Sequence, residues 1–350
     1  MALLNVLVVN AGSTSLKLAL VDEDGSAQPL ASLEEAPADL DAVGHRVVHG
    51  GDRFRDPVLI DETVMAELAA VSELAPLHNA AALTAIEAAR EALPDRPHVA
   101  VFDTAFHATL PEEAATYPLP ARWRRELGLR RYGFHGLSVE WAAERVPVPR
   151  LVVCHLGGGC SVTAVRGGES VDTTMGFTPL EGVPMATRAG SVDPGLLLYL
   201  LRHGLSVDEL EQALEHESGL LGLSGMSPHV HVLETAMVAG DERALLALAV
   251  YGRRIAQAAS SMAVSSGGID ALVFTGGVGE HSFWVRERVC AELGFLGVAV
   301  DDEANMRLRG EGEIAAGDST ARVVVVESRE DVVIARAARR LAATTVGSKP

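Results

Sequence analysis

The amino-acid sequence predicts an α/β protein made of two related halves, and three observations support this prediction. Residues 6–25 read as a strand, a polar loop, an alternating strand and a Gly-containing turn. Residues 151–169 repeat that order. In the rest of the chain, amphipathic helical patterns alternate with short apolar strands, as is typical of α/β domains. The repeat indicates an internal duplication of one α/β unit.

The first repeat begins with an apolar run from Val6 to Val9 and continues into a small polar cluster. Leu16, Leu18 and Leu20 then recur at every second position, which is the period of a half-buried strand. No Gly-Lys-Ser/Thr precedes a helical pattern, so a Walker-type P-loop is not expected here. A hairpin with this polar tip can still clamp a phosphate through backbone N–H groups. An ordinary structural hairpin is the alternative.

Lys17 stands directly behind the polar tip of this hairpin. The chain has only two lysines, Lys17 and Lys349, against 27 arginines. A compact ammonium differs from a guanidinium as a partner for phosphate. A lysine where arginine is otherwise the rule therefore favours a phosphate-binding role for the hairpin.

The other elements follow in order along the chain. Helices are expected at 61–73, 79–93, 194–203, 207–214, 241–265 and 330–343, and strands at 98–102, 269–274 and 322–327. Asp103 comes just after a buried strand, where α/β sheets usually place ligands. Residues 275–282 read as a Gly-rich loop between a strand and a helix, an arrangement that offers backbone amides to an anion.

Composition limits the function classes. With 350 residues, 48% of them hydrophobic, the chain is large enough for two domains or one large α/β domain. A formal charge of −18 and an isoelectric point near 5.1 oppose binding to nucleic acid or anionic membranes. An anionic substrate would need local basic residues.

Cysteine usage and hydropathy bear on the compartment. Three cysteines without a Cys-x-x-Cys spacing predict neither a disulfide framework nor a zinc knuckle. The N-terminal residues lack a basic segment and a cleavage site, and the most apolar helical stretch, Ala244–Tyr251, is too short to cross a bilayer. A cytoplasmic protein is the expectation.

Three polar constellations are candidates for chemistry. Arg46 and Arg188 lie in short Gly-flanked segments and could neutralise a phosphate or a carboxylate. A structural salt bridge is the alternative for each of them. Asp103 and Glu330 are hard carboxylates at element junctions, a donor type that suits Mg²⁺. His135, in Arg-Tyr-Gly-Phe-His-Gly, is read from the residues alone as a loop histidine that is either structural or functional.

Eight motifs in order along the chain resemble those of the acetate kinases, members of the acetate and sugar kinase, Hsp70 and actin superfamily. They are Val-Val-Asn-Ala-Gly-Ser-Thr-Ser-Leu-Lys, Gly-His-Arg-Val-Val-His-Gly-Gly, Glu-Leu-Ala-Pro-Leu-His-Asn, Val-Phe-Asp-Thr-Ala-Phe-His, Arg-Tyr-Gly-Phe-His-Gly, Phe-Thr-Pro-Leu-Glu-Gly, Thr-Gly-Gly-Val-Gly-Glu and Ile-Ala-Arg.

The resemblance implies a duplicated ribonuclease-H-like fold of the actin-like ATPase type, with two domains flanking a nucleotide cleft. An N-terminal acyl- and phosphate-binding domain would span 1–147 and 329–350, and a C-terminal nucleotide-binding domain 148–328. It further implies a homodimer that transfers the γ-phosphoryl of ATP reversibly to acetate by direct in-line displacement, giving acetyl phosphate and ADP. Mg²⁺, or alternatively Mn²⁺, would be the metal.

The resemblance also assigns roles to single residues. Arg46 and Arg188 would bracket the transferring phosphoryl and the acyl carboxylate, and His135 would donate to the equatorial oxygens. Asn10, Asp103 and Glu330 would organise the metal. The phosphate and nucleotide positions would be Asn10, Ser13, Ser15, Lys17, His155, Gly157, Gly159, Gly277 and Gly279, and the pocket for the acetate methyl would be Val48, Leu77, Phe134 and Pro179.

The chain departs from the family pattern at several places. The second phosphate loop has Gly158 where the family has asparagine, His281 also replaces an asparagine, and Ser227–His231 stands where the family has Asp-x-Arg. The segment between Lys17 and Arg46 is shorter than usual. A propionate or butyrate kinase, a kinase with another phosphoryl donor and a non-catalytic nucleotide-binding relative therefore remain alternatives.

Overall fold

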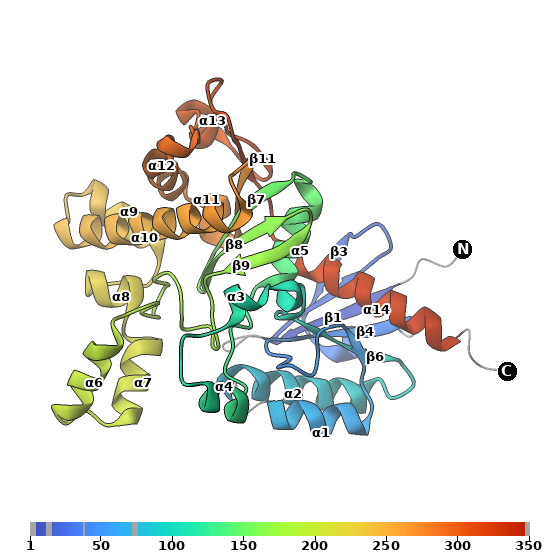
Figure 1. The fold of residues 1–350 in the computed structure, drawn as a ribbon. Coiled ribbons are helices and arrows are strands. Elements are labelled where there is room, and N and C mark those ends of the chain that lie inside the picture. Colours follow the sequence, from blue (N-terminus) through green and yellow to red (C-terminus); the bar gives the residue numbers. More distant parts are fainter. Residues whose placement is uncertain (1–4, 12–15, 38, 72–75, 347–350) are drawn as a thin grey trace. The chain divides into compact units, whose positions relative to one another are not determined.

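The computed structural model describes residues 5–11, 16–37, 39–71 and 76–346, with the side chains of 76–78 and 345–346 outside this description. The chain divides into two compact units (Figure 1). Unit 1 comprises Met1–Ala108, Phe134–Trp141 and Arg329–Pro350, and unit 2 comprises Thr109–Gly133 and Ala142–Ser328. This division follows the contacts between residues. The domain boundaries expected from the sequence remain a prediction.

The sheet of unit 1 has six strands in the order β3-β2-β1-β4-β6-β5. The first three, β1 (Val6–Ala11), β2 (Leu16–Val21) and β3 (Ala27–Leu30), form an antiparallel meander. Strand β4 (Ala42–Val47) runs parallel to β1, and β6 (His98–Phe102) runs parallel to β4. The short β5 (Val58–Leu59) pairs antiparallel with β6 at the edge.

Helices cover both faces of this sheet. Alternate residues of β1 point to opposite faces and pack against different helices. Val6 and Val8 pack with Ile334 of α14 (Glu330–Val346). Leu7 and Val9 pack with Ala89 of α2 (Pro76–Ala92). Helix α1 (Glu62–Val71) packs against α2. Its Leu68 forms a further hydrophobic cluster with Ile86 of α2 and Phe102 of β6.

The sheet of unit 2 has the order β11-β12-β10-β7-β8-β9. Read from its other edge, this order corresponds strand by strand to that of unit 1. Strands β7 (Arg150–Leu156), β8 (Cys160–Arg166) and β9 (Glu169–Thr173) form the antiparallel meander. Strand β10 (Ala271–Thr275) runs parallel to β7 and β12 (Arg322–Val325) parallel to β10, while β11 (Gly312–Glu313) pairs antiparallel with β12. The same pairing pattern in both sheets confirms the predicted duplication.

The longest helix of unit 2, α10 (Glu242–Ser266), lies against β7, β8 and β9. Asp241 caps its N-terminus, and Gly267, at φ +78°, ends it in the left-handed conformation that glycine adopts most easily. The other helices are α3 (Glu112–Ala115), α4 (Ala121–Leu127), α5 (Gly136–Arg145), α6 (Pro194–Arg202), α7 (Val207–His216), α8 (Gly219–Ser224), α9 (Val230–Val238), α11 (Gly276–His281), α12 (Phe283–Glu292) and α13 (Asp302–Arg307). Among the described residues, no helix combines the length and the hydropathy that a membrane span needs.

The Gly-rich segment after β10 differs from its prediction. Residues 276–281 form the short helix α11 instead of a loop. Gly276 has φ +75°, and a Cβ there would lie 2.7 Å from the carbonyl oxygen of Leu156. The chain turns sharply at this glycine and coils at once, so Gly277 and Gly279 are helical residues.

Candidate functional site

Three predicted site residues of unit 1 lie at the carboxyl ends of parallel strands. Asn10 in β1 is the direct neighbour of Arg46 in β4. Asp103 follows β6, whose last residue, Phe102, lies opposite Val47. Because β1, β4 and β6 all run in the same direction, their polar ends meet at one edge of the sheet, where α/β proteins bind ligands.

Arg46 and Asp103 form a two-pronged ion pair at this edge. Nε of Arg46 donates to Oδ1 of Asp103 at 2.8 Å, and Nη2 donates to Oδ2 at 2.5 Å. Nη1 donates to Oδ1 of Asn10 at 3.2 Å, and Oε2 of Glu330 lies 3.7 Å from Nε. The Asp103 side chain is 1% exposed and that of Arg46 16%. The paired contacts fix the plane of the guanidinium as well as its position.

Burial and charge act in opposite directions on this pair. Burial raises the pKa of the Asp103 carboxyl to about 6, although the Arg46 guanidinium lowers it. Burial also disfavours the charge on Arg46, but the carboxylates of Asp103 and Glu330 outweigh this effect and raise the pKa of Arg46. At neutral pH the site therefore holds the Arg46 cation beside the ionised carboxylate of Asp103.

His135 is held next to Asp103 by the backbone. Its φ of 61° is left-handed, a conformation that no other non-glycine residue of the described chain adopts. The amide of Gly136 donates to the carbonyl oxygen of Asp103 at 2.8 Å, and a Cβ on Gly136 would lie 2.3 Å from that oxygen. Such strain in a non-glycine residue is typical of functional positions.

Val48 and Phe134, two residues of the predicted acyl pocket, are buried in unit 1. The ring of His49 meets that of Phe134 edge to face at 5.3 Å between centroids. Oδ1 of Asn79 accepts from the His49 amide at 3.0 Å, and Nδ2 of Asn79 donates to the His49 carbonyl at 2.9 Å. Asn79 was not among the predicted site residues, although it ends one of the matching motifs. The side chain of Leu77 lies outside the described residues.

The predicted phosphate hairpin of unit 1 is only partly described. Ser13 and Ser15 lie outside the described residues. Lys17 pairs with Asn10 across the antiparallel hairpin, and its side chain is exposed.

Unit 2 places its candidate residues at the corresponding strand ends. His155 of β7 is the neighbour of Thr275 in β10, directly before α11. At the tip of the β7–β8 hairpin, the amide of Gly157 donates to the carbonyl of Gly159 at 2.9 Å. In α11, Gly277 is exposed, and a Cβ there would have no atom within 4 Å, whereas Gly279 is buried. The exposed glycine leaves room for a ligand to approach the backbone.

Arg188 lies on a loop that is tied to this hairpin tip and to α7. The carbonyl of Gly158 accepts from the amide of Ala186 at 3.2 Å. Nε of Arg188 lies 3.1 Å from Oε2 of Glu215, and both side chains are mostly buried. Thr187 Oγ1 donates to the carbonyl of Glu215 at 2.8 Å. The helical pattern of 207–214 gave no signal for Glu215, so the partner of Arg188 was missed.

The structure thus gathers the predicted residues in two groups, each described within its own unit. Unit 1 holds Asn10, Lys17, Arg46, Val48, Asp103, Phe134, His135 and Glu330, and unit 2 holds His155, Gly157, Gly159, Pro179, Arg188, Gly277 and Gly279.

The oxygen donors in unit 1 fit a magnesium ion whose remaining ligands would come from water and the substrate. Among the described residues, no group of three or more His, Cys, Asp or Glu side chains could hold a metal ion. Mg²⁺, however, is usually bound by one or two carboxylates together with waters and substrate phosphates. Asp103, Glu330 and the amide oxygen of Asn10, all in contact with Arg46, are oxygen donors of that kind.

A cavity of about 810 Å³ also lies within unit 2. Its wall includes Arg131, Glu181, Ser191 and Arg254. Within the described part of the chain, none of the predicted site residues lines it, although its wall includes Ala189, next to Arg188.

Comparison with known proteins gives a consistent result. The family model described as the acetokinase family matches residues 28–336. The acetate kinase of Nostoc punctiforme is 47% identical over 322 residues, covering 89% of this chain and 78% of that protein. The propionate kinase of Escherichia fergusonii is 47% identical over 313 residues, covering 87% and 77%.

Solved structures agree with these relatives. The crystal structure of Porphyromonas gingivalis acetate kinase superposes with a TM-score of 0.86 at 34% identity, covering 97% of this chain and 99% of that one. A propionate kinase from Francisella tularensis superposes with a TM-score of 0.90 at 32% identity, covering 96% and 99%.

Proposed function

The chain belongs to the acetokinase family, and we propose that it transfers the γ-phosphoryl group of ATP reversibly to acetate, giving acetyl phosphate and ADP. The observation that carries this proposal is the arginine of β4, held in a fixed plane by Asp103 at the carboxyl edge of a parallel sheet. An oriented guanidinium beside oxygen donors for Mg²⁺ is what transfer of a phosphoryl group to an anionic acceptor requires.

The acceptor needs no activation by a base. A carboxylate is already ionised and nucleophilic at pH 7, so the protein has to align it with the phosphorus and neutralise the phosphoryl oxygens. No covalent enzyme intermediate is required. Arg46 and Arg188 supply positive charge in this mechanism, and His135 donates a hydrogen bond to the equatorial oxygens.

The remaining residues position the substrates. Asp103 and Glu330, with the amide oxygen of Asn10, would hold a Mg²⁺ ion, which neutralises phosphate oxygens when bound. Val48, Phe134 and Pro179 are buried apolar residues, suited to contact the methyl group of acetate. The hairpin tip at Gly157 and Gly159 and the open backbone at Gly277 are proposed to receive the donor phosphates.

A propionate kinase is the second candidate, and one observation favours it. The propionate kinase of E. fergusonii is as similar to this chain as the acetate kinase of N. punctiforme. One additional methylene changes discrimination by only about 1–3 kcal/mol, so small differences in the pocket decide between these acids.

The test is to incubate the purified protein with ATP, Mg²⁺ and acetate and to trap acyl phosphate with hydroxylamine. Parallel reactions contain propionate or butyrate as acceptor, and GTP or pyrophosphate as donor. Acyl hydroxamate with acetate and ATP supports the proposal, and a higher kcat/KM with propionate supports the second candidate. No product with any pair, together with thermal stabilisation by ATP, would point to a non-catalytic nucleotide-binding protein.

We also propose that the protein is a homodimer. Light scattering of the purified protein should give twice the chain mass of 36.8 kDa. A monomer mass at micromolar concentration would contradict it.

A further inference from the structure

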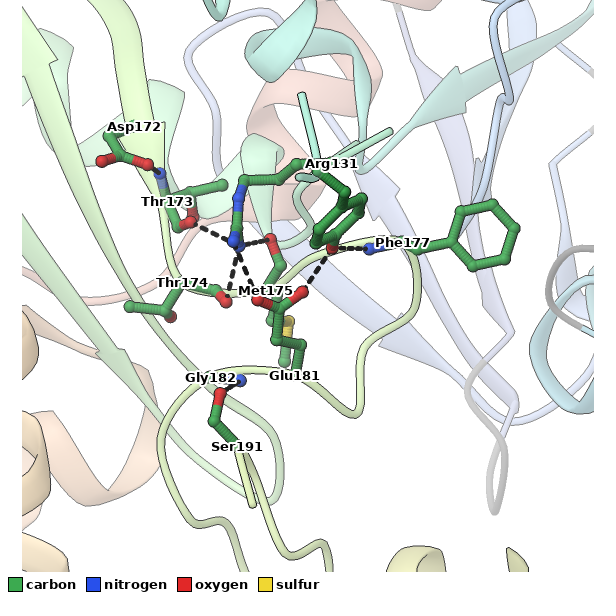
Figure 2. A network of polar contacts seen from close by, with 10 residues as sticks. Arg131, Asp172, Thr173, Thr174, Met175, Phe177, Glu181, Gly182 and Ser191 are labelled. Carbon is green, nitrogen blue, oxygen red and sulfur yellow. Dashed lines mark hydrogen bonds and ion pairs between the residues drawn. The ribbon is translucent and has the colours of Figure 1, made fainter. Parts of the chain in front are cut away.

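A partly buried polar network around Arg131 and Glu181 holds the segment between Phe177 and Glu181 (Figure 2). Pro179 lies in this segment. Nη1 of Arg131 donates to the carbonyl oxygens of Thr173, Thr174 and Met175 at 2.9, 2.9 and 3.0 Å. Nη2 of the same guanidinium donates to Oε1 of Glu181 at 2.8 Å. One arginine thus joins the end of β9 to Glu181, just beyond the Pro179 turn.

Tyr117 completes this network from the other side. Its hydroxyl donates to Oε2 of Glu181 and accepts a hydrogen bond from the amide of Phe177 at 2.8 Å. Burial, together with the Glu181 carboxylate, raises the pKa of Tyr117, so the hydroxyl remains a donor at neutral pH. Pro179 lies two residues from each of the two anchored positions, Phe177 and Glu181, and the short turn is therefore held at both ends.

Gly176 shows how closely this network is packed. A Cβ at this position would lie 1.7 Å from Oε2 of Glu181 and 2.1 Å from the hydroxyl oxygen of Tyr117. The backbone of Gly176 approaches both groups so closely that only glycine fits there. Its carbonyl accepts from the amide of Tyr132 at 3.1 Å. The turn therefore has little space for an alternative position.

The same network leads to the loop that carries Arg188. The amide of Gly182, next to Glu181, donates to Oγ of Ser191 at 3.1 Å, and the amide of Ser191 donates back to the Gly182 carbonyl at 2.8 Å. These two bonds close residues 182–191 into a loop. The position of Glu181 thus also fixes one end of the loop on which Arg188 lies.

We infer that Tyr117 and Glu181 are positioning residues that set the acyl-chain selectivity of this kinase by holding Pro179 in place. The inference rests on the proposed function, in which Pro179 contacts the acyl group. A pocket that distinguishes one methylene depends on the exact position of its walls. Loosening the turn should allow Pro179 to recede and a longer acid to fit.

The test uses Tyr117→Phe, which removes one hydroxyl, with Tyr132→Phe as the matched control. The Tyr132 hydroxyl, also in unit 2, donates to the carbonyl of Gly128 at 3.1 Å, whereas the Tyr117 hydroxyl contacts Glu181 and the Phe177 amide. We measure kcat and KM for acetate, propionate and ATP. For Tyr117→Phe the KM for acetate should rise roughly fivefold to tenfold, the size expected when a partly buried hydrogen bond to a carboxylate is lost. The ratio of kcat/KM for propionate over acetate should rise in parallel, with the KM for ATP unchanged.

Hydrogen exchange of the substrate-free protein gives a readout that does not depend on activity. Peptides covering residues 176–182 should exchange faster in Tyr117→Phe than in Tyr132→Phe, because the Phe177 amide loses its acceptor. Glu181→Gln, which loses the charge opposite Arg131, should shift both readouts in the same direction as Tyr117→Phe.

Three results would overturn the inference, and they are distinguishable. An active wild-type protein whose acid preference is the same in Tyr117→Phe and Tyr132→Phe would overturn the inference alone. A wild-type protein that phosphorylates no carboxylate would overturn the proposed function and the inference with it. An equal rise of the KM for acetate and ATP in Tyr117→Phe would show general loosening of unit 2 and would also reject the selectivity role.

Discussion

At the scale of single residues, the candidate site depends on arginines whose charge is already paired. Arg46 contacts a carboxylate that is 1% exposed, so removing the arginine outright would leave a buried charge without its partner. Such a loss destabilises a protein by about 3–5 kcal/mol and would hide any effect on catalysis. A substitution that keeps the charge and changes the geometry is more informative.

Arg46→Lys should lower kcat/KM for acetate by about 100-fold, because lysine keeps the positive charge and loses the planar two-pronged contact with Asp103. Arg53→Lys is the matched control. Arg53 makes the same kind of two-pronged pair with Glu67, at 3.0 and 2.7 Å, but its side chain is 66% exposed. Steady-state kinetics should show the control within twofold of wild type. An Arg46→Lys enzyme with normal kcat/KM would remove Arg46 from the mechanism.

Glu215 should act on the reaction only through Arg188, whose Nε it holds at 3.1 Å. Glu215→Gln is expected to lower kcat/KM about tenfold, and Arg188→Ala about 1000-fold. The double variant should be no worse than Arg188→Ala, because residues in contact are not additive. A double-mutant cycle measured with acetate and ATP checks this. Additive losses would mean that Glu215 acts independently of Arg188.

At the scale of elements, much of the architecture could be predicted from the sequence. The period of the hydrophobic residues and the positions of turn residues determine where helices and strands form. The strand at 98–102 agrees with β6 residue for residue, and both strand–tip–strand repeats became antiparallel hairpins. Arg46, Asp103 and Glu330 were recognised as site candidates, and the structure brings them into contact. The ion pair between them was not predicted, since local patterns do not show which distant residues meet.

Other contacts had no local signal at all. The two hydrogen bonds between Asn79 and His49 join residues 30 positions apart, and Glu215 reaches the Arg188 loop from helix α7. The left-handed backbone of His135 was missed because that conformation is rare outside glycine. Tertiary packing decides each of these features, so periodicity and turn chemistry cannot reveal them.

The packing of α14 on β4 leads to a stability prediction. A Cβ at Gly44 would lie 2.6 Å from Cγ2 of Ile334, so Gly44→Ala must shift the Ile334 side chain or α14 itself. Overpacking of this kind typically costs about 1–3 kcal/mol. Gly294→Ala is the control, because no atom lies within 4 Å of its Cβ position. Urea unfolding should show a lower midpoint for Gly44→Ala only, and equal midpoints would mean that the helix adapts without cost.

At the scale of the whole molecule, the buried histidines make the two units differ in their response to acid. Burial lowers the pKa of His45 and of His98, whose rings stack at 5.2 Å, and lowers the pKa of His107 to about 4. All three lie in unit 1. In the unfolded chain a histidine binds its proton near pH 6.5, so below that pH the unfolded state binds more protons than the folded state.

The contribution of these histidines to the free energy of unfolding is therefore fully present above about pH 6.5. It declines as the pH falls towards 4, where His107 also becomes charged in the folded protein. For His107 alone the loss is about 3 kcal/mol, because its pKa falls from 6.5 to about 4. The raised pKa of Asp103, also in unit 1, opposes this loss over the same pH range, because the folded state binds that proton first. The three histidines outnumber this one carboxyl, so unit 1 should open before unit 2 in mild acid. Hydrogen exchange at pH 7.5 and pH 5, corrected for intrinsic rates, should show protection lost in peptides of β4 and β6 and kept in peptides of β7 and β10. Equal loss in both units would mean that they unfold as one cooperative body, and greater loss in β7 and β10 would show that groups of unit 2 control acid stability.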